Sequence, residues 1–113
     1  MLTEAHFRLM KPSALFVNTG RGPTVDEPAL VKALQEGQIA AAAIDVTEEE
    51  PAAKDNPLRT MENVILTPHT AYYSDEAYVE SRRRVGQEIA AILTGRRPRN
   101  CVNPSVLERL PLS

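Results

Sequence analysis

Four side chains that could act on an anionic substrate follow short apolar runs in the first two thirds of the chain. They are Arg21, Asp45, Glu50 and His69. An arginine guanidinium offers a planar fork of donors that matches a carboxylate. An imidazole gives or takes a proton near neutral pH, and an adjacent carboxylate orients it and favours its protonated form. Together these groups predict acid–base chemistry on an anion.

Each of these residues also has a purely structural interpretation. Arg21 lies in a Gly-containing turn and could be a solvated loop charge. Glu50 ends the acidic run 48–50, and acidic runs are commonly just solvated. His69 follows Pro68 and could simply cap a strand. Spacing by itself therefore leaves the catalytic and the structural interpretations open.

Three apolar runs of strand length must position the four side chains. They cover residues 14–17, 39–46 and 63–66. Strands that are apolar on both faces are typical of parallel sheets covered by helices. Ligands of such sheets bind outside the carboxyl ends of the strands. The four side chains fall at or just after these ends, so the sheet itself predicts where they gather.

Three helices are predicted from capping residues and apolar spacing, at about 4–10, 27–36 and 74–94. Thr3 caps the first, while Asp26 and Gly37 mark the ends of the second. Ser74 and Gly95 mark the ends of the third. A broad apolar face runs along this third helix: Val79, Val85, Ile89, Ile92 and Leu93. The order strand, helix, strand, loop, strand, long helix indicates an α/β fold with a parallel sheet.

Composition narrows the function classes. The chain has 113 residues, 42% of them apolar and 25% charged, with a formal net charge of −2. This balance gives no support for nucleic-acid binding, and no apolar run approaches the roughly 18 residues of a membrane span. The single cysteine, Cys101, cannot form an internal disulfide or a metal site, so we expect no metal and a reducing, cytoplasmic setting.

Several separate blocks of the sequence, in the right order, resemble the D-isomer-specific 2-hydroxyacid dehydrogenases. The blocks are Met10 to Gly22, Val25-Asp26-Glu27, Asp45-Val46, Glu50-Pro51, Asn63-Val64-Ile65 and Thr67-Pro68-His69. The resemblance covers essentially the whole chain. It implies the C-terminal half of a Rossmann-type NAD-binding domain over 1–72. It also implies that 73–113 form a long helix and tail that return to the substrate domain.

The resemblance implies a role for each matching position. Arg21 matches the arginine that binds the 2-keto acid, Glu50 the acid that partners the histidine, and His69 the histidine that moves the proton. The reaction it implies is hydride transfer between a nicotinamide and C2 of a small 2-keto or D-2-hydroxy acid. The full-length enzyme is expected to be a homodimer that binds neither nucleic acid nor a membrane.

The resemblance also implies a cofactor site. The positions expected to line the nicotinamide end are Thr19, Gly20, Arg21, Asp45, His69 and Ala71. NAD is the expected cofactor, and NADP is not excluded. The pyrophosphate of such cofactors sits on a G-x-G-x-x-G turn, but glycine occurs only at 20, 22, 37, 86 and 95. We therefore expect a fragment of an enzyme that is inactive by itself.

A narrower resemblance points to the C-terminal binding protein branch, which includes co-repressors and bacterial dehydrogenases. It rests on residues 68–74, 94–98 and 100–103. Tyr72, predicted in the substrate pocket, stands where the co-repressors carry a tryptophan, which favours a metabolic dehydrogenase. A cofactor-regulated binding module and an inactive remnant remain the alternatives.

Overall fold

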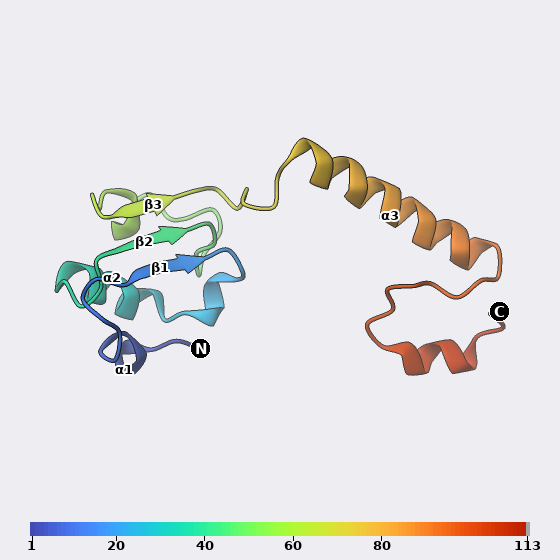
Figure 1. Ribbon diagram of the computed structural model, residues 1–113, viewed down its shortest axis with the longest axis horizontal. Helices are drawn as coiled ribbons and strands as arrows, with labels where there is room; N and C mark the ends of the chain where they lie inside the picture. The colour runs from blue at the N-terminus through green and yellow to red at the C-terminus, as the bar shows by residue number, and fades with distance from the viewer. Residues whose placement is uncertain (113) are drawn as a thin grey trace. The chain divides into compact units, whose positions relative to one another are not determined.

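The computed structural model describes residues 1–112 and divides the chain into two compact units. Residues 1–71 form the first, which we call the sheet unit, and the chain from residue 72 onward forms the second, the α3 unit. The elements of the sheet unit, in chain order, are α1 (Glu4–Phe7), β1 (Leu15–Asn18), α2 (Glu27–Gln35), β2 (Ala41–Ile44) and β3 (Val64–Leu66) (Figure 1).

The three strands form a parallel sheet in the order β1-β2-β3, as the α/β prediction requires. Phe16 lies opposite Ala42, and Ala42 lies opposite Val64, so the strands end at the same edge. The helix α2 makes the crossover between β1 and β2, which brings the turns that follow β1, β2 and β3 together at that edge.

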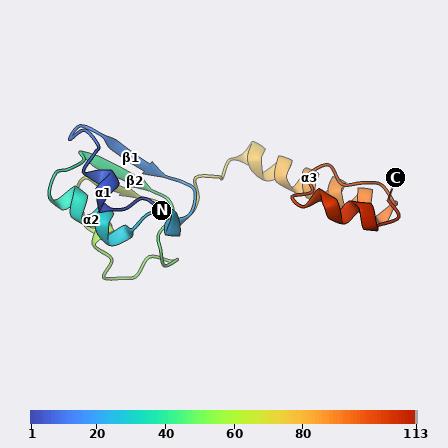
Figure 2. The same ribbon diagram turned by 90° about the horizontal axis from the view of Figure 1, so that it is seen from below.

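One face of the sheet carries the hydrophobic core. Figure 2 shows α1 and α2 on the same side of the strands. The largest fully buried side chains are Phe7, Leu30, Ile39 and Leu58. The Phe7 ring meets Phe16 of β1 edge-on, with ring centroids 5.5 Å apart. Burying each side chain of this size stabilises the fold by about 1.5–3 kcal/mol.

The opposite face of the sheet is exposed. Leu15, Val17 and Ile65 are 74%, 63% and 68% exposed, because alternate side chains of a strand point to opposite faces. Within residues 1–112, β1 pairs only with β2, so its outer edge is open as well. Helices therefore cover one face of this parallel sheet rather than both.

Local signals set the bounds of α2. The Asp26 carboxylate accepts the N–H of Ala29 at 3.1 Å, and Gly37 adopts the left-handed conformation (φ 69°) that ends a helix without steric cost. Both capping predictions are confirmed. Asp26 and Gly37 thus mark the two ends of the helix that connects β1 to β2.

Two predicted elements are shorter than expected. The helix predicted at 4–10 ends at Phe7, because the N–H groups of Leu9 and Met10 bond to carbonyls three residues back in a tighter turn. The strand predicted at 39–46 covers only Ala41–Ile44. Its partner β1 is equally short, and beyond Asp45 the chain turns away from the sheet.

The α3 unit holds one long helix, α3 (Asp75–Leu93). The Ser74 hydroxyl caps it by accepting the N–H of Ala77 at 3.0 Å, and Gly95 ends it at φ 74°. All five residues of its predicted apolar face are exposed. Among residues 1–112, α3 included, no helix is long and apolar enough to cross a membrane.

Candidate active site

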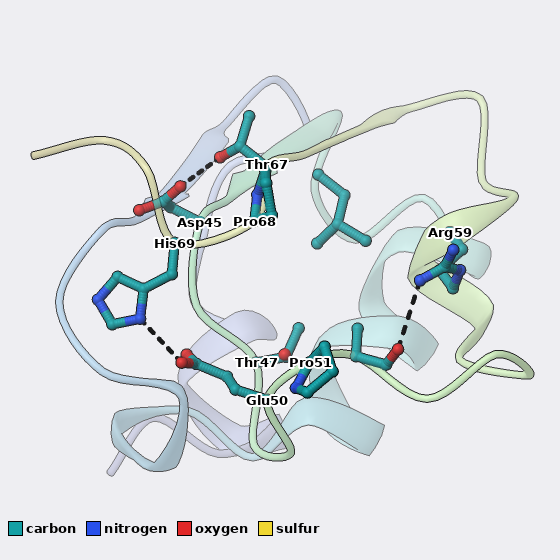
Figure 3. Close-up of a pocket in the computed structure, with 10 residues that line it drawn as sticks. Asp45, Thr47, Glu50, Pro51, Arg59, Thr67, Pro68 and His69 are labelled. Carbon is teal, nitrogen blue, oxygen red and sulfur yellow. Dashed lines mark hydrogen bonds and ion pairs between the residues drawn. The ribbon is translucent and has the colours of Figure 1, made fainter. Parts of the chain in front are cut away.

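The segments that follow β2 and β3 line a pocket of about 590 Å³ at the carboxyl edge of the sheet (Figure 3). Its lining residues are Asp45, Thr47, Glu50, Pro51, Ala52, Arg59, Leu66, Thr67, Pro68 and His69. Three of the four predicted acid–base residues are among them. The parallel order of the strands is what brings these residues together, since they are far apart along the chain.

His69 and Glu50 form the central pair of the site. The imidazole Nδ1 lies 2.8 Å from Glu50 Oε2, and the two side chains are 40% and 38% exposed. A carboxylate at Nδ1 holds the ring orientation and favours the tautomer with a proton on Nδ1. In that tautomer Nε2 is the ring nitrogen that carries the lone pair and can accept a proton. The neighbouring Glu48 carboxylate instead accepts the N–H of Glu27.

Asp45 holds the turn that carries His69. Its carboxylate accepts the Thr67 hydroxyl at 2.5 Å and the N–H groups of Thr70 and Ala71 at 2.8 and 2.9 Å. The Thr67 hydrogen bond, followed by those of Ala71 and Thr70 and the nearby His69, lowers the pKa of Asp45, although desolvation acts in the opposite direction. Asp45 is therefore an ionised, nearly buried acceptor.

Arg21 lies on the neighbouring turn rather than in the pocket. Its side chain is exposed, and Nη1 donates to the carbonyl of Gly20 at 2.7 Å. The buried Asn18 shapes this turn by accepting the N–H of Gly20 at 3.1 Å and donating to the carbonyl of Arg21 at 3.3 Å. The structure thus pairs His69 with Glu50 and holds Arg21 on a turn of its own.

The Arg21 turn is nevertheless fixed to the loop that carries Glu50. Gly22 is buried against the backbone of Thr47, where no side chain would fit. Glu27 and Glu48 also bond reciprocally, because the backbone N–H of each donates to the carboxylate of the other at 3.1 and 2.9 Å. These contacts set the position of the Arg21 turn relative to the Glu50 loop.

The remaining predicted site residues belong to both units. Thr19 and Gly20 are exposed at the end of β1, and the Ala71 N–H bonds to Asp45. Tyr72 begins the α3 unit, is 68% exposed and packs its ring edge-on to Tyr73, with centroids 6.3 Å apart. Within residues 1–112, no three His, Cys, Asp or Glu side chains converge to hold a metal ion.

Sequence reasoning assigned no role to four residues that shape the site: Asn18, Gly22, Arg59 and Thr67. A polar residue at the end of an apolar run, as at 18 and 67, is the one signal that could have pointed to a buried hydrogen bond. Nothing local marks Arg59, which donates to the carbonyl of Ala52 at 3.3 Å across the pocket from His69 (Figure 3).

Comparison with known proteins gives consistent similarities. Residues 1–71 match the family model of the D-isomer specific 2-hydroxyacid dehydrogenase NAD binding domain. Glyoxylate/hydroxypyruvate reductase B of Cronobacter sakazakii is 44% identical over 108 residues, which are 96% of this chain and 33% of that protein. The chain thus spans about a third of the length of the curated relatives that it matches.

Two solved structures extend the comparison. D-lactate dehydrogenase with NAD+ from Lactobacillus jensenii has a TM-score of 0.79 and 29% identity, over 90% of this chain and 34% of that one. The NADPH-dependent glyoxylate/hydroxypyruvate reductase from Sinorhizobium meliloti, in complex with NADP and malonate, has a TM-score of 0.77 and 37% identity, over 85% of this chain and 30% of that one.

Proposed function

Because the chain belongs to the D-isomer specific 2-hydroxyacid dehydrogenase family, we propose that it supplies the acid–base half of such an enzyme's active site. The proposed reaction transfers a hydride between a nicotinamide and C2 of a small 2-keto or D-2-hydroxy acid. The observation that carries this proposal is the pairing of His69 Nδ1 with Glu50 Oε2 at 2.8 Å, on turns that follow neighbouring parallel strands.

The proposed mechanism uses both ring nitrogens of His69. Glu50 accepts a hydrogen bond from Nδ1–H and stabilises the imidazolium, and Nε2 donates its proton to the substrate oxygen as that oxygen gains charge. In the reverse direction Nε2 removes the hydroxyl proton. The guanidinium of Arg21 binds the substrate carboxylate through its two-pronged donor geometry. A bound nicotinamide would supply or accept the hydride at C2.

The turns at this edge fit the nicotinamide end of a dinucleotide. Thr19 and Gly20 are exposed there, and a Cβ atom at position 20 would meet only Asn18 Oδ1, at 3.5 Å, so the β1 turn leaves space for a flat ring. Arg21, Asp45, His69 and Ala71 are the other residues proposed to line it. The 113 residues contain no G-x-G-x-x-G turn, so we expect other residues to hold the pyrophosphate.

The relatives support a narrower choice of substrate and cofactor. We propose glyoxylate and hydroxypyruvate as substrates, since those two compounds appear in the names of the reductases from Cronobacter sakazakii and Sinorhizobium meliloti. Either NAD or NADP could serve, because the solved relatives hold NAD+ in one case and NADP in another. We also propose that the full-length protein is a cytoplasmic homodimer and that residues 73–113 lie beside its substrate domain.

The C-terminal binding protein branch is the narrower hypothesis for residues 68–74 and 94–103. Tyr72 in place of the co-repressors' tryptophan supports a metabolic enzyme, and so do the reductase names of the curated relatives. We therefore place the chain with the dehydrogenases that turn over their substrates, rather than with cofactor-regulated binding modules.

A chimera tests the proposal. The chain would replace the matching third of the Cronobacter sakazakii reductase, and oxidation of NADH and NADPH by glyoxylate and hydroxypyruvate would be followed by absorbance. We expect turnover, and we expect His69→Asn to lower kcat by about 10²–10⁴-fold, as for a lost general acid or base.

His6→Asn is the matched control, because His6 lies in α1, away from the strand ends. This control should keep kcat close to that of the unsubstituted chimera. Near-normal turnover by the His69→Asn chimera would refute the proposed role of His69.

A further inference from the structure

Thr67 lies between the sheet and the catalytic pair, and the mechanism above does not use it. It follows β3 directly, and its hydroxyl donates to Oδ1 of the nearly buried Asp45. The same Oδ1 atom accepts the N–H of Thr70, while Oδ2 accepts that of Ala71. The backbone carbonyl of Asp45 accepts the N–H of His69 at 2.9 Å. Asp45 thus binds the chain on both sides of His69 and at His69 itself.

His69 needs this support because of its backbone conformation. Its φ is 55°, and it is the one non-glycine residue in the described part of the chain with a positive φ. The left-handed region costs a side chain with a Cβ free energy, so surrounding contacts must impose it. The direction of the His69 side chain, and with it the distance from Nδ1 to Glu50, depends on this conformation.

We propose that Thr67 is a positioning residue: its hydroxyl holds the Asp45 carboxylate in the orientation that keeps His69 left-handed and directs Nδ1 toward Glu50. This inference deepens the proposed function and rests on it, since it concerns the same site. Without the hydroxyl, one donor to Oδ1 is lost and the carboxylate is freer to rotate. The turn at 69–71 then loses its fixed acceptor, and the pairing of His69 with Glu50 loosens.

The two histidines of the chain provide a contrast for the test. His69 Nδ1 pairs with a carboxylate, so it should carry the proton of the neutral ring. His6 Nδ1 accepts the backbone N–H of Thr3 at 3.0 Å, so it should carry none. Ring ¹⁵N shifts of the labelled 113-residue chain, recorded where both rings are neutral, distinguish these tautomers.

Thr67→Val removes the hydroxyl and keeps the shape of the side chain. We expect His69 to lose its Nδ1–H signature in this variant while His6 is unchanged. Thr67→Ser restores the hydroxyl and should restore the signature. Thr60→Val is the matched control. The Thr60 hydroxyl donates to the carbonyl of Pro57 at 3.3 Å, so its loss should leave both histidines unchanged.

Three results would overturn the inference. One is an Nδ1–H signature of His69 that survives Thr67→Val, and another is its absence from the unsubstituted chain. The third is that Thr67→Val and Thr67→Ala both lose the amide spectrum of a folded chain while Thr67→Ser keeps it. The hydroxyl would then be needed for the folding of the whole sheet and not for the position of His69 in particular.

Activity gives an independent readout. In the chimera, Thr67→Val should lower kcat and leave KM nearly unchanged, because Arg21 binds the substrate from another turn. An inactive parent chimera would refute the proposed function and leave the tautomer result standing. An active chimera in which Thr67→Val changes neither the tautomer nor kcat would refute the role of Thr67 alone.

Discussion

Gly22 lies so close to Thr47 that a Cβ atom at position 22 would stand 1.8 Å from the Thr47 carbonyl oxygen and 2.7 Å from the backbone nitrogen of Glu48. Both neighbours are backbone atoms, which a rotamer change cannot move aside. This approach joins the turn after β1 to the loop after β2. The proposed substrate-binding Arg21 and the proposed proton-transfer partner Glu50 therefore depend on the same glycine.

Gly22→Ala should destabilise the chain and weaken the site together. We expect a loss of about 1–3 kcal/mol in the free energy of unfolding, as for other forced insertions of a methyl group into close packing. Gly20→Ala, in the same turn, meets only Asn18 Oδ1 at 3.5 Å and should cost little. Urea denaturation of both variants checks the difference, and equal stability would show that the contact with Thr47 relaxes freely.

Glu50→Gln should lower kcat of the chimera and leave KM nearly unchanged. The carboxylate, 2.8 Å from His69 Nδ1, orients the imidazole and favours the tautomer with a proton on Nδ1. An amide can present its NH2 group to that nitrogen instead, so the preference weakens. Steady-state kinetics measures the change, and Glu49→Gln, one residue away in the same acidic run, is the control. An equal fall of kcat in both variants would point to the general charge of the loop.

Arg21→Lys should keep the charge and lose the fork geometry. We expect kcat/KM to fall by about 10- to 100-fold, the equivalent of one charge-assisted hydrogen bond. Steady-state kinetics of the chimera measures this, with Arg8→Lys, at the exposed residue that follows α1, as the control. If kcat/KM is unchanged, Arg21 is only a loop charge.

Acid should weaken α3 over a defined range of pH. Hydrogen bonds from Arg83 and Arg84 lower the pKa of Glu80 from 4.5 to about 2. A lowered pKa means that the stabilisation is complete above pH 4.5 and is lost as the pH falls toward about 2.

Backbone chemical shifts of α3 residues should follow this loss of stabilisation. In Glu80→Gln the helix should be weaker at neutral pH and change less over the same range, whereas Glu62→Gln, outside α3, should behave like the unsubstituted chain. Identical acid profiles for the Glu80→Gln variant and the unsubstituted chain would show that this ion-pair cluster does not support the helix.

The 113-residue chain alone should neither bind NADH tightly nor reduce a 2-keto acid. No glycine-rich turn is present to hold a pyrophosphate, and the exposed face of the sheet together with the open edge of β1 favours self-association. Calorimetric titration with NADH tests the binding, and sedimentation tests the self-association. Leu15→Lys should reduce the self-association, whereas micromolar NADH affinity would refute the first expectation.

The sequence alone was sufficient for the order and class of the elements, for the ends of α2 and α3, and for the expectation that Glu50 and His69 lie at the same edge of the sheet. These features follow from local physics: caps such as Asp26 and Ser74, terminating glycines, and apolar runs whose carboxyl ends must share one edge of a parallel sheet. The pairing of Glu50 with His69 came from the family resemblance, and the comparisons confirm the family over residues 1–71.

Only the tertiary structure decided how the site is held. The bonds from Thr67, Thr70 and Ala71 to Asp45 span more than twenty residues of sequence, and the close approach of Gly22 to Thr47 joins two separate loops. No cap or periodicity encodes such pairings. They arise because a buried carboxylate must find donors, and those donors are whatever backbone and side-chain groups the packed sheet places beside it.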